Sequence, residues 1–316
     1  MTRAFVFPGQ GSQFPGMGKE LFENFVTARE VFEEVDEALE QNLSKLIFTG
    51  EESDLNLTEN TQPALMAVSI AVQRILEKDM GVVLGDDKNT AFVAGHSLGE
   101  YSALTAAGTL SLSDTARLLR IRGQAMQKAV PVGVGAMAAI LGLEFDDVSA
   151  IAKEATNSEI CSAANDNAFG QVVVSGHVQA VEKAIALATE KGAKRALMLP
   201  VSAPFHCPLM QPAADAMAEA LSKVEMRVPV VPLVANVTAA AVESPAEILD
   251  LLVKQVTGTV RWRESVLYMK EQGVEKLVEL GAGKVLAGLT KRIDRELSAM
   301  SIGTPADLEE FANSQM

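Results

Sequence analysis

The chain has 316 residues, of which 48% are hydrophobic, and a formal net charge of −14. This content can bury a substantial core, and the negative charge argues against nucleic-acid binding because phosphates would be repelled. The sequence has neither a signal-peptide core nor a run near the roughly 18 apolar residues of a membrane helix, so we expect a globular cytoplasmic protein. The two cysteines, Cys161 and Cys207, lack ligand spacing and indicate neither a disulfide framework nor a zinc site.

The chain alternates strand-like and helix-like segments, which favours an α/β architecture. A strand at 4–7 leads into a glycine-rich turn at 8–13, and helical patterns follow at 28–39 and 63–77. The turn has neither of the glycine spacings of nucleotide-binding loops, so nucleotide binding is a weak interpretation.

A strand at 91–95 and a helix-permissive run at 100–107 enclose the pentapeptide Gly-His-Ser-Leu-Gly. Gly-x-Ser-x-Gly in this context is typical of a nucleophile elbow, in which a sharp turn exposes one serine. Ser97 is therefore the candidate nucleophile, and the helix that starts there points backbone N–H groups at an oxyanion. The tight turn around Gln10 fits the second donor of an oxyanion hole better than it fits a phosphate.

Ser111 and Asp114 predict a capping box for a helix that runs to about residue 128. Most of its charged side chains share one face, but Arg122 lies on the apolar face that should be buried. A buried guanidinium without a partner is costly, so Arg122 must meet an internal carboxylate or a carboxylate brought by a ligand. An internal ion pair, or a stem that reaches solvent, explains this position equally well.

The region from 131 to 199 has a different pattern. It predicts strands at 134–140, 160–163, 171–175 and 195–199, with helices at 145–155 and 177–191. This βαββαβ order is the ferredoxin-like one. We therefore predict a large α/β domain formed by residues 1–130 and 200–316, with a small subdomain inserted at 131–199. A later strand at 276–280, with glycines and a helix after it, belongs to the large domain.

A serine nucleophile needs a base, and histidine is the usual one because its pKa lies near neutrality. Of the three histidines, His96 adjoins Ser97, so its side chain should diverge, and a packed residue is the simpler interpretation. His177 begins a helix, where capping or exposure suffices. His206 lies in a proline-containing loop, a common place for catalytic side chains, and is the candidate base. With 41 acidic residues, the sequence nominates no third member of a triad.

Taken together, these residues resemble the malonyl-CoA:acyl carrier protein transacylase family of fatty acid synthesis, over nearly the whole chain. Seven motifs occur in the family's order, at 7–13, 95–100, 122–123, 201–206, 235–238, 260–262 and 279–283. The resemblance implies a hydrolase-like large domain with a parallel sheet core and a ferredoxin-like insertion. The pattern of elements leads to the same division.

The resemblance also implies catalytic roles. Ser97 would be the nucleophile and His206 its general base, with the backbone carbonyl of Gln255 orienting the imidazole. The backbone N–H groups of Gln10 and Leu98 would form the oxyanion hole.

The same resemblance implies the substrate contacts. Arg122 would bind the free carboxylate of a malonyl group through two hydrogen bonds, and Asn165 would line the acyl site from the small subdomain. Phe205, before the histidine, is similar to the residue of malonyl-selective members.

The implied reaction transfers malonyl from malonyl-CoA to the phosphopantetheine thiol of acyl carrier protein, by a ping-pong mechanism through a malonyl-serine ester. No cofactor is implied, and the partners are these two substrates, with no nucleic acid, no membrane and a monomeric enzyme. A serine thioesterase, a polyketide acyltransferase of broader range and a catalytically silent scaffold for acyl carrier protein stay open as alternatives.

A carrier protein is acidic, and so is this chain. The one conspicuous concentration of positive charge comes late, at Lys284, Lys291, Arg292 and Arg295. A solvated helix face is the simple explanation, and a docking surface for acyl carrier protein is the alternative.

Overall fold

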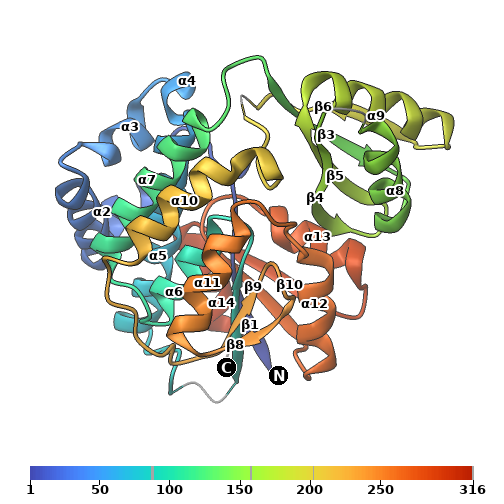
Figure 1. Ribbon diagram of the computed structural model, residues 1–316. Coiled ribbons are helices and arrows are strands. Elements are labelled where there is room, and N and C mark those ends of the chain that lie inside the picture. Colours follow the sequence, from blue (N-terminus) through green and yellow to red (C-terminus); the bar gives the residue numbers. More distant parts are fainter. Residues whose placement is uncertain (87–88, 157–158, 202, 315–316) are drawn as a thin grey trace.

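The computed structural model describes residues 1–86, 89–156, 159–201 and 203–314, and its centre is a six-stranded sheet (Figure 1). The strands follow the order β10-β9-β1-β2-β7-β8. Their bounds are β1 Arg3–Phe7, β2 Thr90–Gly95, β7 Leu233–Ala235, β8 Ala240–Val242, β9 Lys276–Leu280 and β10 Ser298–Ile302. All neighbours pair in parallel except β7 and β8, which are antiparallel. The protein is therefore of the α/β class with a mainly parallel sheet, as the alternation of elements predicts.

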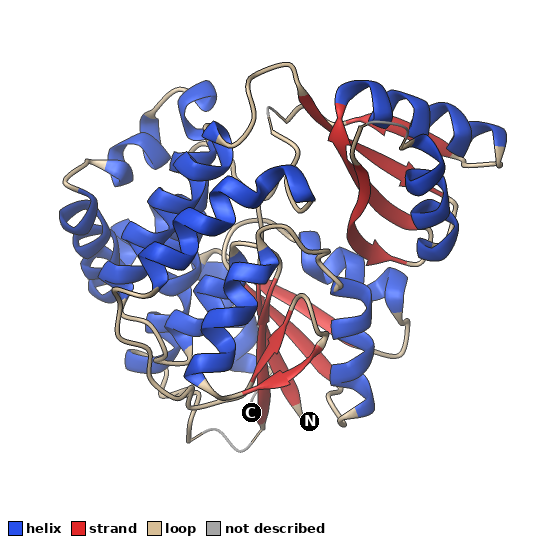
Figure 2. Cartoon of the chain, viewed as in Figure 1, coloured by secondary structure: helices blue, strands red, loops and turns tan. Residues whose placement is uncertain are grey.

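Helices cover both faces of this sheet (Figure 2). Successive side chains of a strand point to opposite faces, and β1 shows the consequence. Phe5 and Phe7 pack into a large core with most of the helices, whereas Ala4 and Val6 pack into a second core with α12 (Trp262–Glu271) and α13 (Val285–Ile293). The central strands are thus buried on both sides, and the turns at their carboxyl ends are held rigidly.

The large core is built from helices of several segments. They are α1 Lys19–Asn24, α2 Val26–Leu39, α3 Leu43–Thr49, α4 Glu52–Leu55, α5 Thr58–Lys78, α6 Gly99–Ala106, α7 Leu112–Lys128, α10 Gln211–Leu221, α11 Pro245–Gln255 and α14 Pro305–Asn313. The short 3-10 helix η1, Pro208–Met210, precedes α10. Within the described ranges, no helix is both long and apolar enough to cross a membrane.

Helix α5 begins five residues before the predicted start at Pro63. Proline favours the first turn of a helix, and polar residues before it suggest a loop. In the structure Thr58, Asn60, Thr61 and Gln62 are buried in the first turns of the helix, and Thr61 Oγ1 donates to the carbonyl of Leu55 over 2.6 Å. The polar residues therefore meet internal partners, which their sequence does not reveal.

A second, four-stranded antiparallel sheet has the order β4-β5-β3-β6, with two helices packed on its outer face (Figure 1). In chain order the elements are β3 Gly135–Leu141, α8 Phe145–Ala155, β4 Cys161–Ala168, β5 Gln171–His177, α9 Val178–Glu190 and β6 Arg195–Met198. This order agrees with the predicted one. Strand β4 runs five residues beyond its predicted end. Its polar half faces a cavity, and Asn165 forms a β-bridge with Val260, which lies between α11 and α12.

Candidate active site

The turn between β2 and α6 exposes Ser97 at the centre of the large sheet. Ser97 has φ of 53°, in the left-handed region that residues other than glycine rarely adopt. A Cβ on Gly95 would lie 1.9 Å from the carbonyl carbon of Gly99, and a Cβ on Gly99 would lie 2.2 Å from the oxygen of Phe7. Only glycine fits at either end, so the motif builds the sharp turn that the sequence predicts.

Ser97 and His206 form a hydrogen-bonded pair. Nε2 of His206 lies 2.8 Å from Ser97 Oγ, and its Nδ1 lies 2.9 Å from the backbone oxygen of Gln255. A carbonyl oxygen only accepts, so Nδ1 carries the proton and the hydroxyl of Ser97 donates to Nε2. Burial, with the nearby charge of Arg122, lowers the pKa of His206 to about 3, so the imidazole is neutral at pH 7.

Asn236, which follows β7, braces the turn and is a residue that sequence reasoning left without a role. Its Oδ1 accepts from the backbone N–H of Ser97 over 2.8 Å, and its Nδ2 donates to the oxygen of Gly95 over 2.6 Å. One buried amide therefore holds the elbow at Gly95 and at the strained Ser97. The signal in the sequence is the resemblance motif at 235–238, which contains it.

The N–H of Ser97 is occupied by Asn236, which leaves Leu98 and Gln10 as the amide donors facing the site. Both residues line the cavity described below. Within the described part of the chain, neither backbone N–H has a hydrogen-bond acceptor. A Cβ on Gly9 would lie 2.6 Å from the oxygen of His96, so the Gln10 turn passes directly beside the elbow. Two free donors beside a serine are what an oxyanion hole needs.

Arg122 on α7 is 1% exposed, which excludes a stem that reaches solvent. Its Nη1 donates to Gln62 Oε1 over 2.8 Å, and its Nη2 donates to Ser97 Oγ over 3.1 Å and to Gln255 Oε1 over 2.9 Å. The guanidinium carbon of Arg122 lies 5.6 Å from the centre of the Tyr101 ring. It forms no ion pair with a carboxylate among the described residues, and its Nε has no partner. The internal ion pair that the sequence left open is absent there, and a buried positive charge faces Ser97.

A cavity of about 210 Å³ opens over Ser97 between the two sheets. The serine, the histidine and the arginine line it with the Gln10 turn and with side chains of the four-stranded sheet, among them Met137, Asn165, Asn167 and Val173. Asn165 is 8% exposed, and its buried Oδ1 has no hydrogen-bond partner among the described residues. Phe205 lines the same cavity. Ser202, which belongs to the motif at 201–206, lies outside the described residues.

The other two histidines have partners of their own. His96 lines the cavity and its Nε2 lies 2.8 Å from Asn167 Oδ1, which ties the elbow to β4. Burial lowers the pKa of His96. His177 is the N-cap residue of α9, as expected, but its side chain makes no capping hydrogen bond, and its Nδ1 accepts from the N–H of Ile160.

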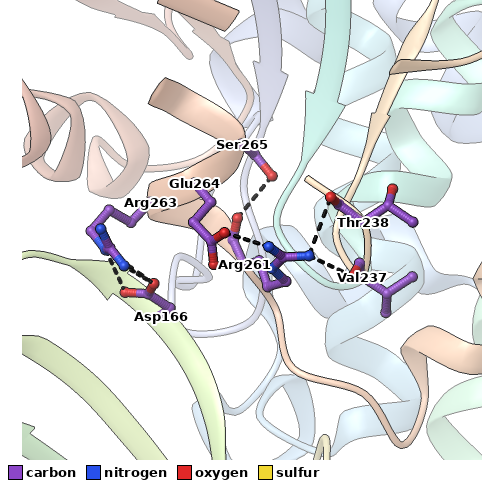
Figure 3. A network of polar contacts seen from close by, with 7 residues as sticks. All are labelled: Asp166, Val237, Thr238, Arg261, Arg263, Glu264 and Ser265. Carbon is purple, nitrogen blue, oxygen red and sulfur yellow. Dashed lines mark hydrogen bonds and ion pairs between the residues drawn. The ribbon is translucent and has the colours of Figure 1, made fainter. Parts of the chain in front are cut away.

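An ion pair joins β4 to α12 (Figure 3). Asp166 is fully buried and accepts from Arg263 of α12, with Nη2 at 2.8 Å and Nε at 3.0 Å. Its neighbours Asn165 and Asn167 point the other way, into the cavity, as alternation along a strand requires. The pair therefore anchors the strand that presents both asparagines.

Sequence reasoning did not identify two further polar side chains of the site. Gln62 is buried on α5 and fixes one side of the Arg122 guanidinium. The side chain of Gln255 fixes the other side and donates from Nε2 to the oxygen of Ser97 over 2.9 Å. The described residues contain no cluster of histidine, cysteine or carboxylate side chains that could hold a metal ion.

The chain matches the family described as the acyl transferase domain over residues 4–303. It is 46% identical over 307 residues to the malonyl CoA-acyl carrier protein transacylase of Bacillus subtilis (strain 168), covering 97% of this chain and 95% of that one. The crystal structure of an acyl-carrier-protein-S-malonyltransferase from Bartonella henselae is 55% identical, with a TM-score of 0.96 and 99% of both chains covered.

Another similar structure is a malonyl-transacylase in complex with its type II PKS acyl-carrier protein, in the holo form. It is 43% identical, with a TM-score of 0.95, and the match covers 99% of this chain and 100% of that one. These matches extend over nearly the full length of each chain and include the elbow, the histidine loop and both sheets. The chain therefore belongs to the acyl transferase family.

Proposed function

We propose that this protein transfers the malonyl group from malonyl-CoA to the phosphopantetheine thiol of acyl carrier protein, and so supplies malonyl-carrier protein for fatty acid synthesis. The observation on which the proposal depends is Arg122, a buried cation that touches Ser97 Oγ and lacks a carboxylate partner within the described ranges. A malonyl group bears its carboxylate on the carbon next to the acyl carbonyl. That short reach suits a guanidinium placed directly beside the nucleophile.

The first half-reaction forms the serine ester. Nε2 of His206 takes the proton of Ser97, whose oxygen attacks the thioester carbonyl, and the N–H groups of Gln10 and Leu98 hold the oxyanion. When the carbon–sulfur bond breaks, His206 gives the proton to the sulfur and coenzyme A leaves as a thiol. The Gln255 carbonyl stabilises the imidazolium that exists between these two transfers.

The second half-reaction moves the acyl group to the carrier. The pantetheine thiol gives its proton to His206 and attacks the ester carbonyl, through the same oxyanion hole. The bond from the carbonyl carbon to Ser97 Oγ then breaks, and His206 returns the proton to the serine. The reaction is ping-pong and needs no cofactor, because malonyl-CoA and the carrier are both substrates.

The docking surface for the carrier is the exposed side of α13. This helix lies against both sheets, and its residues Val285, Leu286 and Leu289 line the cavity. The four cations at positions 284, 291, 292 and 295 are exposed, and none forms an ion pair with the rest of the described chain. Arg292 donates to Gln171, another cavity residue, over 2.8 Å. A negatively charged carrier bound here would deliver its pantetheine to the cavity mouth.

The domain division fits this arrangement. We take residues 1–130 and 200–316 as a hydrolase-like large domain and 131–199 as a ferredoxin-like insertion, with the site between them. The large domain supplies the nucleophile, the base and Arg122, and the insertion supplies Asn165, which would contact the acyl group. The enzyme would act as a monomer in the cytoplasm.

The test is transfer from a panel of acyl-CoAs to holo acyl carrier protein, with hydrolysis measured alongside. We expect malonyl to be transferred to the thiol much faster than to water, and faster than acetyl or methylmalonyl. Hydrolysis that exceeds transfer would identify a thioesterase instead. Similar rates for malonyl and methylmalonyl would identify an acyltransferase of broader range, as in a polyketide pathway.

A further inference from the structure

Glu100 on α6 is a fully buried carboxyl group that the proposed reaction does not use. Its Oε2 accepts from the backbone N–H of Asn236 over 2.9 Å and from Gln255 Nε2 over 3.2 Å. Its Oε1 has no hydrogen-bond partner within the described part of the molecule. An ionised carboxylate with one bare oxygen is poorly solvated in a buried site, so a neighbouring positive charge must contribute to its stability.

The Gln255 side chain links this carboxyl group to Arg122. Its Nε2 donates to Glu100 and to the oxygen of Ser97, while its Oε1 accepts from Arg122 Nη2. The amide can satisfy all of these contacts in only one orientation. Glu100 and Arg122 therefore share a bridging amide and make no direct ion pair. The guanidinium stays free to bind a ligand carboxylate while its charge is balanced nearby.

The charges around this pair are few. From the element that carries Glu100, Tyr101 has its pKa raised to about 12 by burial and is neutral. From the loop before η1, His206 is neutral as well, and Asn236 and Gln255 carry no charge. Burial raises the pKa of Glu100 itself to about 7, against the opposing effects of its hydrogen bonds and of Arg122. The empty site thus holds one permanent cation and one carboxyl group that titrates near neutrality.

We propose that Glu100 is a positioning residue that balances Arg122 in the empty site and takes up one proton from solvent when a carboxylated acyl group occupies Ser97. This inference rests on the proposed function. A bound malonyl carboxylate would place a second negative charge on the same guanidinium, and two buried carboxylates cannot both stay ionised beside one cation at low cost. Protonation of Glu100 removes the excess charge and leaves Arg122 to the substrate.

The proposal fixes the sign of a pH dependence. Above pH 7, Glu100 of the empty enzyme is ionised and malonyl loading must bring in a proton, so the loading constant falls by about tenfold per pH unit. Below pH 7 the group is already protonated, and loading does not depend on its titration. A neutral acyl group brings no second charge, so loading with acetyl should lack the pH dependence that proton uptake by Glu100 causes.

The experiment counts protons per acyl-enzyme. Wild-type enzyme is mixed with malonyl-CoA in weakly buffered solution with a pH indicator, and intact-protein mass spectrometry counts the ester formed. After correction for ionisation of the released coenzyme A thiol, proton uptake per ester should be clearly larger at pH 8 than at pH 6, with one proton per ester as its upper limit. The isosteric variant Glu100→Gln should take up none at either pH, and its malonyl loading should be flat between pH 6 and 8.

The outcomes separate this inference from the proposed function. Ester formation without extra uptake at pH 8, or uptake that persists in Glu100→Gln, overturns the role of Glu100 and leaves malonyl transfer standing. Absence of any ester on the wild type contradicts the proposed function itself. If Glu100→Gln fails to fold, the wild-type comparison of pH 6 with pH 8 still decides the question, because a purely structural carboxyl group predicts equal uptake at both.

Discussion

Nη2 of Arg122 donates to Oγ of Ser97 over 3.1 Å, across 25 positions of the chain. The guanidinium is held on its other sides by Gln62 and Gln255, both neutral. A buried cation held at the nucleophile selects acyl groups by charge, because a carboxylated acyl group can make a direct charge-assisted contact with it and a neutral acyl group cannot.

Replacing this arginine should change acyl preference. We expect Arg122→Ala to lower the ratio of malonyl to acetyl loading by roughly tenfold to a hundredfold, since a charge-assisted hydrogen bond contributes about 1.5–3 kcal/mol. The matched control is Arg117→Ala, an exposed arginine on the same helix whose one ion pair among the described residues is with Asp114. Single-turnover rates with both acyl-CoAs give the ratio, and an unchanged ratio in Arg122→Ala would remove the carboxylate role.

The pH profile of acylation should lack the usual histidine step. The pKa of His206 is lowered from 6.5 to about 3, chiefly by burial, so the neutral base persists well below pH 6.5. We expect the single-turnover rate of Ser97 acylation by acetyl-CoA to stay nearly constant from pH 7 to pH 5. A midpoint near pH 6.5 would show that the imidazole titrates as a free one.

Acid stability is the control for that experiment. The unfolded state binds a proton on His206 below pH 6.5 and the folded state does not, so stability falls as the pH falls through 6.5. Circular dichroism at each pH identifies the range in which the enzyme stays folded. A loss of rate that coincides with unfolding says nothing about the base.

How much of the site could be predicted from the sequence depends on how far apart along the chain the contacting residues lie. The elbow at 95–99 is a local pattern, so its strand, turn and helix follow from the sequence, and the buried face of α7 identifies Arg122 by periodicity alone. The groups that hold Arg122 and Ser97 cannot be predicted in this way. Gln62 lies 60 positions from Arg122, and Asn236 lies 139 positions from Ser97. No local pattern marks a polar side chain whose partner is that distant.

The sequence did not predict the polar half of β4, residues 164–168, for a related reason. Asn, Asp and Asn at 165–167 are poor strand formers, and alone they suggest a loop. The structure keeps them extended because Asp166 pairs with Arg263 and the backbone N–H of Asp166 donates to Val260 over 2.9 Å. Tertiary contacts here outweigh intrinsic propensity, beside the cavity where a polar surface is useful.

That ion pair should matter for stability. Arg263→Ala leaves the buried carboxylate of Asp166 without its partner, and we expect a loss of about 3–5 kcal/mol in the free energy of unfolding. Combining it with Asp166→Asn removes the stranded charge and should recover part of the loss. Urea denaturation of the four proteins of this cycle measures both effects. Additive losses in the double variant would mean that the two side chains do not interact.

The α13 surface should control binding of the carrier. Reversing charge by Lys291→Glu and Arg295→Glu should raise KM for acyl carrier protein at low salt, because the carrier is acidic and would then be repelled. Lys191→Glu combined with Lys194→Glu, at two exposed lysines directly after α9, is the charge-matched control. Equal KM values for wild type and the α13 variant at low salt would place the docking surface elsewhere.

The most direct test of the account is the mass of the intact protein after it is mixed with malonyl-CoA. We predict one malonyl adduct on the wild-type chain, located on Ser97 by peptide mapping and removed by holo acyl carrier protein, and none on Ser97→Ala. An adduct that survives in Ser97→Ala would assign the nucleophile to another residue. No adduct on either protein would contradict covalent acyl transfer and leave a scaffold for the carrier as the function.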